Sequence, residues 1–459
     1  MVETVYHLSR LHRYSKNQGR LRILLVAPSN DASDILVEKL APYFPPSEMI
    51  RVLAFTRNIE DVSPEVRKYV REGLAPEQVI PQIKSKQIQI VVSTVNLAAR
   101  FWCIGEGLKP GHFDILCVDE AGHATEPEVM GVAATLFNFT AKANPNQLVL
   151  AGDPRQLGPI ITSKLCKKHG MEVSYMERLV TKSPAYLPDM ASGEYPPDLV
   201  TLLVRNYRSH PNILSLPNKM FYDNKLIPCG DKLSTHSMAT WEHLPKRGFP
   251  LIFHAVEGTN EREGSSPSWF NPEEVIEVIE YVKLLVNQSK PGIRQDEIGV
   301  ITPYARQVQK IQLGLEASGF RDIKVGSVET FQGQERRCII VSTVRTENDL
   351  LEFDRKYNLG FVASKKRFNV AVTRAKALLI VVGNPRVLET DQKNWLPLLR
   401  HCNDNDSIVG AEWKEGDAAA ESDDEISHAG AAIQELEAEE DPWQIVAAQE
   451  AHGFINREE

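Results

Sequence analysis

The chain has 459 residues, of which 42% are hydrophobic and 25% are charged, a balance typical of a soluble globular protein with two or three domains. Its six cysteines are scattered and form no C-x-x-C pair, which argues against a zinc site or a disulfide framework and favours a reducing compartment. No apolar run approaches the roughly 18 residues that cross a membrane, and the polar stretch 1–19 is unlike a signal peptide. We therefore expect a cytoplasmic protein without a membrane partner.

The net charge of −9 is unevenly distributed along the chain. Residues 411–459 contain 15 Asp or Glu and two basic residues, a balance of −13, so residues 1–410 carry +4. A mildly basic body is compatible with a local phosphate-binding groove. We expect residues 403–459 to form an acidic, mostly disordered tail. Trp413 and Trp443 are its candidate anchors, either on the tail's own domain or on a partner.

Short β-rich runs occur in two series, separated by helical or loop segments, which is the pattern of parallel sheets covered on both faces. An amphipathic helix over 270–286 belongs to the second series. We predict two α/β domains, 1–200 and 201–402, before the tail 403–459. The expected strands are 22–27, 88–93, 114–118 and 147–151 in the first domain, and 251–255, 298–302, 323–328, 338–343 and 378–383 in the second.

An acidic pair, Asp119 and Glu120, follows the apolar run 114–118. In open α/β sheets, ligands bind at the carboxyl ends of strands, and nucleotide hydrolysis needs a held Mg²⁺ and a positioned water. We predict that Asp119 is the metal residue and that Glu120 orients or deprotonates the attacking water. An isolated Asp-Glu pair is more often a surface feature, and its place after an apolar strand favours the catalytic interpretation.

Three further residues complete the predicted catalytic set. Gln156, in a Gly-Asp-Pro-Arg-Gln turn after the next strand, is expected to sense the phosphate or the water. Arg208 and Arg374 are candidate arginine fingers, because a planar guanidinium contacts phosphate through two bonds at once. The structural alternatives are an ordinary β-turn for the glutamine segment and surface ion pairs for the arginines.

Other candidates concern the nucleotide's sugar and base, and the nucleic-acid partner. Glu335, after the flexible Gly333, is expected to contact ribose or a metal-bound water, and Tyr207 is expected either to stack near the base or to pack in a hinge. Small polar residues after strands suit contacts with the backbone of a nucleic acid, although such residues also cap helices. The predicted RNA-binding residues are Ser29, Asn30, Ser93, Thr94, Pro303, Tyr304 and Thr330.

Several motifs together resemble the superfamily-one RNA helicases of the up-frameshift group, and within it the Armitage and Mov-ten-like branch. The resemblance implies two RecA-like P-loop NTPase domains, use of ATP and Mg²⁺, and 5′-to-3′ unwinding of RNA or remodelling of ribonucleoproteins. It further implies single-stranded RNA and silencing-complex proteins as partners, and cytoplasmic granules as a location. The residues that carry it are Ala27–Asn30, Asp119–His123, Gly152–Pro159, Leu203–Pro211, Phe249–Pro250, Arg262–Glu274, Val325–Glu335 and Phe368–Lys376.

One motif of that family does not occur in this sequence, which contains no G-x-x-x-x-G-K-[ST] and no Gly-Lys pair. The resemblance puts this phosphate loop directly before a helix that aligns with 2–14. We therefore expect the first domain to lack its N-terminal strand and P-loop, to expose an apolar sheet edge, and to turn over ATP weakly or not at all.

Three functional hypotheses remain open at this point. The first is an ATP-dependent RNA helicase whose phosphate loop lies upstream of this sequence. The second is a non-catalytic RNA-binding scaffold derived from a helicase, which would bind RNA without dependence on ATP. The third is a DNA-directed relative, which would prefer DNA over RNA in competition.

Overall fold

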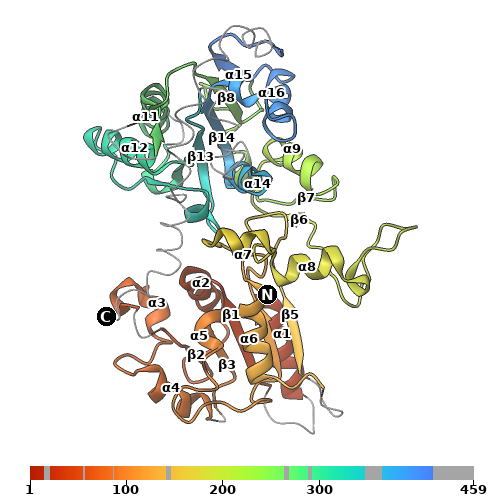
Figure 1. Ribbon diagram of the computed structural model, residues 1–459. Helices are drawn as coiled ribbons and strands as arrows, with labels where there is room; N and C mark the ends of the chain where they lie inside the picture. The colour runs from red at the N-terminus through yellow and green to blue at the C-terminus, as the bar shows by residue number, and fades with distance from the viewer. Residues whose placement is uncertain are drawn as a thin grey trace. The chain divides into compact units, whose positions relative to one another are not determined.

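The computed structural model of the chain consists of two compact units (Figure 1). Unit 1 contains Met1–Pro154 and Gly158–Thr201, and unit 2 contains Arg155–Leu157 and the described residues from Leu202 onward. In the described part of the chain, no helix is long and apolar enough to cross a membrane. The structure describes residues 1–14, 21–54, 57–85, 87–140, 146–262, 268–287, 292–346 and 364–416.

Unit 1 is built on a five-stranded sheet of order β2-β3-β1-β4-β5, in which every neighbouring pair is parallel. β5 forms one edge of the sheet, and its Leu148, Val149 and Leu150 are only half-buried. β5 is therefore an apolar edge strand that the described residues cover only in part. The strands are β1 (Ile23–Ala27), β2 (Met49–Arg51), β3 (Ile90–Thr94), β4 (Ile115–Val118) and β5 (Gln147–Leu150).

Helices cover both faces of this sheet because side chains along a strand alternate between its faces. Ile23 and Leu25 of β1 pack in a core with α1, α2 and α3, whereas Leu24 and Val26 pack in a second core with α4, α5 and α6. The strands consequently read as continuous apolar runs. The helices of unit 1 are α1 (Val2–Tyr14), α2 (Asn30–Leu40), α3 (Pro64–Arg67), α4 (Pro76–Ile83), α5 (Val95–Ala98), α6 (Glu126–Leu136), α7 (Lys164–Lys168) and α8 (Tyr175–Lys182).

Unit 2 is built on a six-stranded parallel sheet of order β12-β11-β13-β14-β8-β15. Two small sheets accompany it, β6 (Arg205–Asn206) with β7 (Ile227–Pro228) and β9 (Glu261–Arg262) with β10 (Trp269–Phe270). The strands of the large sheet are β8 (Leu251–Ala255), β11 (Ile298–Ile301), β12 (Lys324–Gly326), β13 (Arg336–Ser342), β14 (Ala375–Gly383) and β15 (Ile408–Gly410).

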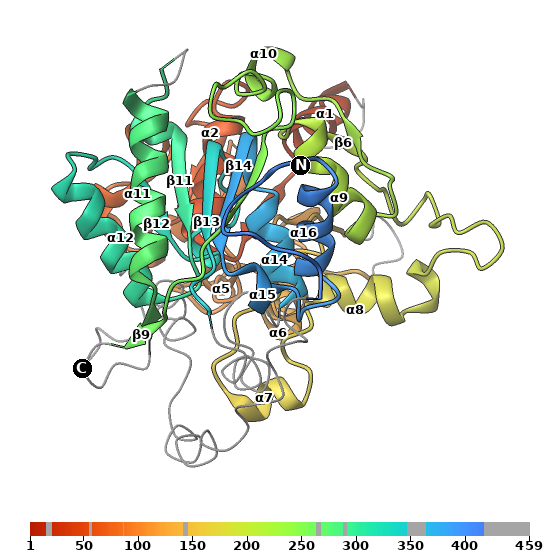
Figure 2. The same cartoon turned by 90° about the horizontal axis from the view of Figure 1, so that it is seen from above.

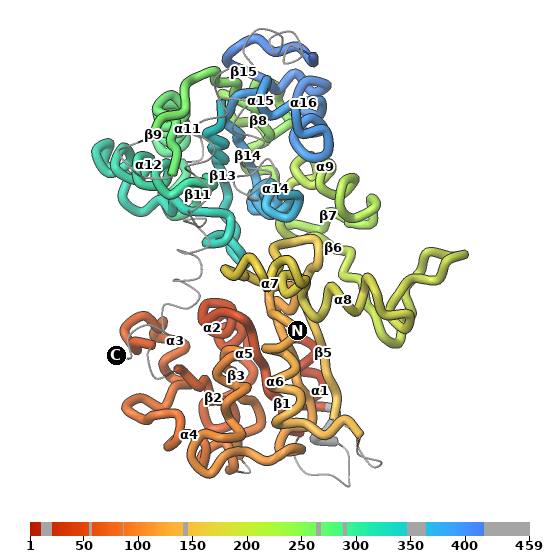
Figure 3. Tube along the Cα trace, in the orientation of Figure 1, coloured from red at the N-terminus to blue at the C-terminus, as the bar shows by residue number. Residues whose placement is uncertain are grey.

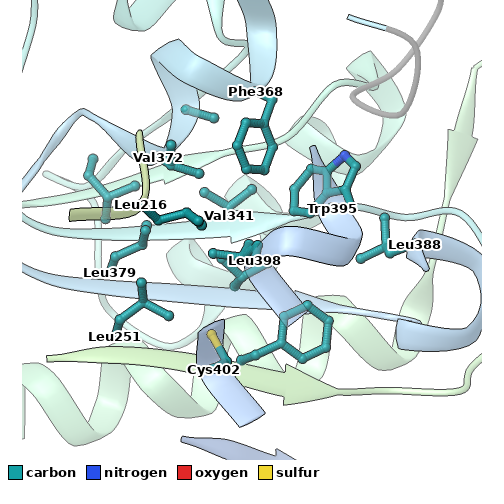
Figure 4. Close-up of a cluster of buried hydrophobic side chains, with 14 of the residues drawn as sticks. Leu216, Leu251, Val341, Phe368, Val372, Leu379, Leu388, Trp395, Leu398 and Cys402 are labelled. Carbon is teal, nitrogen blue, oxygen red and sulfur yellow. The ribbon is translucent and has the colours of Figure 1, made fainter. Parts of the chain in front are cut away.

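The large sheet of unit 2 is also covered on both faces (Figure 2). α11 and α12 pack on one face, and α9, α14, α15 and α16 pack on the other. The rings of Phe368 and Trp395 meet edge to face, 4.9 Å apart, in the second of these cores (Figure 4). The helices are α9 (Pro211–Phe221), α10 (Lys232–Thr235), α11 (Pro272–Asn287), α12 (Ala305–Ala317), α14 (Lys365–Val372), α15 (Pro385–Leu388) and α16 (Trp395–Asn403).

The second sheet continues into the segment that we expected to be a disordered tail. β15 pairs with β8 beyond residue 402, and Trp413 is 9% exposed with its Nε1–H donating to Glu389 at 2.9 Å. The expectation was wrong for residues 403–416, because a three-residue strand and one buried tryptophan are enough to fasten this short segment. Of the two candidate anchors, Trp413 packs on its own unit. Residues 417–459, with Trp443, lie outside the described residues.

The segment between α8 and the end of unit 1 is a long surface loop, drawn in yellow in Figure 3. A turn within it is organised by Asp189, whose carboxylate accepts hydrogen bonds from the backbone of Ala191 and Ser192. These hydrogen bonds lower the pKa of Asp189.

Candidate functional site

The acidic pair lies in a constrained turn at the carboxyl end of β4. The backbone N–H of Asp119 still donates to the Val26 carbonyl of β1 at 2.8 Å, and that of Ala121 donates to Ala151 at 2.8 Å. Between them Glu120 has a φ of 50°, a left-handed conformation that costs a residue with a side chain about 1–2 kcal/mol. Such strain persists where the surroundings impose it, and it clusters at functional sites.

Two glycines allow this turn to lie directly against the turn that follows β5. A Cβ on Gly122 would lie 2.9 Å from the carbonyl oxygen of Asp153, and one on Gly152 would lie 2.8 Å from the Gly122 nitrogen. Real Cβ atoms do not approach backbone atoms so closely, so both positions require glycine. The turn with the acidic pair and the Gly-Asp-Pro-Arg-Gln turn therefore pack against each other at the carboxyl end of the first sheet.

Asp119 lies in a largely buried environment, and this burial raises the pKa of its carboxyl group. No group of three or more His, Cys, Asp or Glu among the described residues forms a ready-made metal site. Mg²⁺ is commonly held by one or two carboxylates together with substrate phosphates and water, and the pair of Asp119 and Glu120 fits that donor set.

Three predicted RNA-binding residues lie at the same carboxyl end of the first sheet, on β1 next to β4 and on β3 one strand further. Ser29 and Asn30 follow β1, and Thr94 ends β3, whose register pairs it with Ala27 of β1. Ser29 caps α2 by accepting a hydrogen bond from the Ala32 N–H at 3.1 Å. At this carboxyl end of the sheet, the nucleotide candidates follow β4 and β5, whereas the RNA candidates follow β1 and β3. The two groups therefore occupy different halves of the same end of the sheet.

Ser93 departs from the expectation. Its side chain is fully buried, and its carbonyl accepts a hydrogen bond from the Ser33 hydroxyl of α2 at 3.2 Å. Its hydroxyl is therefore not on the surface for an RNA contact. Ser93 instead joins α2 to the end of β3.

In unit 2, the predicted nucleotide residues gather at the amino end of the sheet. The Glu335 carboxylate pairs with Arg208 Nε at 2.5 Å and with Lys376 Nζ at 2.8 Å. Burial alone would raise the pKa of Glu335, but hydrogen bonds and positive charge from Lys376 and Arg208 outweigh it and lower the pKa to about 2. Glu335 is therefore ionised at neutral pH and holds both cations.

Arg374 is brought together with Gln156. Arg374 is 1% exposed; its Nη2 donates to Gln156 Oε1 at 3.2 Å, and its Nε donates to the Val370 carbonyl at 3.2 Å. The neighbouring Arg155 carbonyl accepts a hydrogen bond from Asn369 Nδ2 at 3.0 Å. The Gly-Asp-Pro-Arg-Gln motif thus begins in unit 1 and ends as part of unit 2.

The Asn-Tyr-Arg-Ser-His motif is fastened to the same sheet end. Asn206 Oδ1 accepts hydrogen bonds from the backbone of Arg208 and Ser209, both at 3.0 Å, which fixes the turn before the arginine. Tyr207 is 66% exposed, so its ring is open to solvent rather than packed inside unit 2. Gly333 has a φ of 71°, which explains a glycine in the loop before Glu335.

The RNA candidates of unit 2 lie at the opposite end of the sheet. Pro303 and Tyr304 follow β11, whereas Glu335 and Arg374 precede β13 and β14, and all these strands are parallel. Both Pro303 and Tyr304 are buried, and the Tyr304 hydroxyl accepts a hydrogen bond from Arg345 Nε at 2.8 Å. Their rings therefore pack within unit 2 instead of facing a nucleic acid.

Thr330 is half-buried in the short helical turn after β12. Its hydroxyl donates to the Ser327 carbonyl at 2.9 Å. A Cβ on Gly326 would lie 2.2 Å from the Thr330 hydroxyl oxygen. A glycine at position 326 therefore leaves the space that the Thr330 side chain occupies. Thr330 remains the accessible polar candidate at this end of the second sheet.

Sequence reasoning missed two basic residues of these sites. Lys376 follows Arg374 by two positions, and such a spacing puts two side chains on one side of an extended strand. This spacing could have indicated that Lys376 belongs to the same site. Arg51 interrupts an apolar run in β2 and is 1% exposed. A charged residue inside an apolar run indicates a buried ion pair, here with Asp34 at 2.7 Å.

Comparison with known proteins gives matches to helicases over most of the chain. Two family models, both described as AAA domain, match residues 54–164 and 171–386. The Danio rerio helicase mov-10-B.1 is 45% identical over 415 residues, which are 87% of this chain and 40% of that protein. The Homo sapiens RNA helicase Mov10l1 is 46% identical over 81% of this chain and 30% of its own length.

A third relative is the Drosophila melanogaster RNA helicase armi, which is 33% identical over 90% of this chain and 36% of its own length. The chain thus spans 30–40% of the length of these three relatives. Among solved structures, the Arterivirus nonstructural protein 10 helicase matches with 12% identity and a TM-score of 0.38, over 84% of this chain and 57% of that one. A TM-score so low says nothing further about the fold.

Proposed function

We propose that this chain, which is similar to the Mov10 and Armitage RNA helicases, is the motor part of an ATP-dependent RNA helicase or ribonucleoprotein-remodelling ATPase. The observation that carries the proposal is the arrangement of charged residues around the ends of the two sheets. Unit 1 presents an acidic pair on a constrained turn, and unit 2 presents Arg208 and Lys376 around the Glu335 carboxylate, with the buried Arg374 bonded to Gln156.

The residues of unit 1 would act on the metal and the water. Asp119 would hold Mg²⁺, which when bound neutralises charge on the phosphates of ATP. Glu120 would orient the attacking water and accept its proton. The left-handed backbone of Glu120 would separate the roles of these two neighbouring carboxylates, so that one would serve the metal and the other the water.

The residues of unit 2 would act on the phosphate charge. Arg208 and Arg374 are oriented by named partners before any substrate arrives, so little ordering is left for the moment of reaction. Glu335 would hold Arg208 through its carboxylate while accepting a ribose hydroxyl, and the open ring of Tyr207 would stack on the base. Gln156, bonded to Arg374, would link the phosphate to the rest of unit 2.

RNA would lie across the other groups of strand ends. Ser29, Asn30 and Thr94 in unit 1 and Thr330 in unit 2 offer small polar donors for the RNA backbone. Contacts of this kind position a strand without reading its sequence. Involvement in RNA silencing, a place in cytoplasmic granules and a 5′-to-3′ direction are further parts of this proposal.

A second candidate function is a non-catalytic RNA-binding scaffold. The observation in its favour is that the sequence contains no G-x-x-x-x-G-K-[ST] loop, whose amides and lysine hold the phosphates in P-loop enzymes. A scaffold would use the strand-end contacts to RNA and would bind RNA equally well with and without ATP.

A strand-displacement assay tests the proposal. The protein is a form extended upstream to include an in-frame Gly-Lys-Thr loop, and the substrates are RNA and DNA duplexes with a 5′ or a 3′ overhang. We expect ATP-dependent displacement of the RNA duplex with the 5′ overhang and none by the Glu120→Gln variant. Tight RNA binding without displacement would favour the scaffold, and preferential displacement of DNA would favour a DNA-directed relative.

A further inference from the structure

A buried arginine lies behind one of the strand-end RNA candidates of unit 1. Arg51, in β2, donates from Nε to Asp34 Oδ1 at 2.7 Å, from Nη1 to the Val52 carbonyl at 2.7 Å, and from Nη2 to Asn30 Oδ1 at 3.0 Å. Its side chain is fully buried and that of Asp34 is 13% exposed. All three nitrogens of the guanidinium are thereby fixed.

This contact decides which way the Asn30 amide points. A guanidinium can donate hydrogen bonds but cannot accept them, so the atom of Asn30 that faces Arg51 has to be the oxygen. The –NH₂ group is then left on the other side of the amide. Asn30 is half-buried at the first position of α2, where an amide donor is next to the end of β1.

A second arginine shares the carboxylate without touching the amide. Arg57 Nη2 pairs with the other oxygen of Asp34 at 2.9 Å, and its side chain is 9% exposed. The cluster of Arg51, Arg57 and Asp34 therefore has one carboxylate for two guanidinium groups. The excess positive charge lies on the RNA half of this end of the sheet, away from Asp119 on the nucleotide half.

We infer that Arg51 is a positioning residue for RNA binding: it holds the Asn30 side-chain amide with its –NH₂ group directed at a backbone phosphate of a single-stranded RNA. This inference rests on the proposed function, because it needs Asn30 to contact RNA. It adds a residue that makes no RNA contact itself. A fixed donor binds phosphate more tightly than a rotating one because less side-chain freedom is lost on binding.

The test is the affinity of the 459-residue chain for a single-stranded oligouridine, measured by fluorescence anisotropy at one fixed salt concentration. Asn30→Ala and Arg51→Lys are each expected to weaken binding about tenfold, the effect of losing about 1.4 kcal/mol. The double variant is expected to lose about tenfold as well, because both changes remove one and the same contact. Arg57→Lys is the matched control, since it keeps the charge beside Asp34 and leaves Asn30 alone; it is expected to stay within about twofold.

Asn30→Asp separates positioning from folding, and it carries the test if Arg51→Lys does not fold. This variant keeps an oxygen for Arg51 but replaces the donor with negative charge, so we expect an unchanged melting temperature and at least a tenfold loss of RNA affinity. Losses that multiply to about a hundredfold in the double variant would overturn the inference. So would unchanged binding by Asn30→Asp. A parent chain that binds no RNA would contradict the proposed function as well.

Discussion

Replacing Glu335 by Gln tests whether the charged cluster of unit 2 is held together by that carboxylate. The change keeps the size of the side chain and removes the charge that pairs with Arg208 at 2.5 Å and Lys376 at 2.8 Å. Two cations then remain close together without their shared partner. We expect a less stable unit 2 at neutral pH and a more mobile Arg208.

The magnitude follows from the pKa of Glu335, which is lowered from 4.5 to about 2. A shift of this size corresponds to about 3 kcal/mol for a fully shielded group. Because 37% of the Glu335 side chain is exposed, solvent screening reduces this to about 1–2 kcal/mol. Since the pKa is lower in the folded state, the stabilisation is complete above the unfolded value and declines as the pH falls; about two fifths is lost by pH 3.5.

The assay is urea denaturation of the parent chain and the Glu335→Gln variant at pH 7 and at pH 3.5. The difference in unfolding free energy should be about 1–2 kcal/mol at pH 7 and clearly smaller at pH 3.5. Glu415→Gln is the control, because its ion pair with Arg400 is about half exposed on both sides and should change little at either pH. A difference for Glu335→Gln that is absent, or that grows toward low pH, would refute the reasoning.

Three further outcomes follow from the same structure. Arg374→Ala, in a form with a phosphate loop, should lower ATP turnover about 10³-fold or more without changing RNA affinity; equal losses in both assays would contradict its role. Gly122→Ala should destabilise unit 1 by about 1–3 kcal/mol in urea denaturation, because its Cβ would lie 2.9 Å from a carbonyl oxygen after β5. Gly292→Ala is the control and should be neutral, because a Cβ there meets nothing within 4 Å. Trp413→Ala should cost about 3 kcal/mol in the same experiment, through lost packing and the lost bond to Glu389; a cost below about 1 kcal/mol would mean that this segment is not part of the core.

The large strands were predictable because each is an apolar run buried on both faces. The ranges 251–255 and 298–302, for instance, agree with β8 and β11 to within one residue. The three-residue strands β2 and β15 were missed. β2 contains Arg51, whose burial depends on Asp34 seventeen positions earlier, and no local pattern conveys such a partner.

The residue types of the site were readable from the sequence, but their arrangement was not. Asp119 and Glu120 could be assigned to a strand end, whereas the left-handed Glu120 lies between two hydrogen bonds, one to β1 and one to the residue after β5. That Tyr304 would be buried against Arg345 depends on packing between two residues 41 positions apart in the sequence. The separation of Tyr304 from Glu335 across the second sheet likewise follows from strand direction, which only the three-dimensional pairing fixes.

RNA-stimulated ATP hydrolysis tests the central claim most directly, with two proteins measured side by side. One is the 459-residue chain, and the other is the same chain extended upstream to include an in-frame Gly-Lys-Thr loop. We predict RNA-stimulated turnover by the extended form and turnover at least 10²-fold lower by the 459-residue chain, because an electrostatic element that acts on the phosphates is commonly worth about 10²–10³ in rate. Absence of turnover in both forms would contradict the account of these two units as an ATP-driven motor.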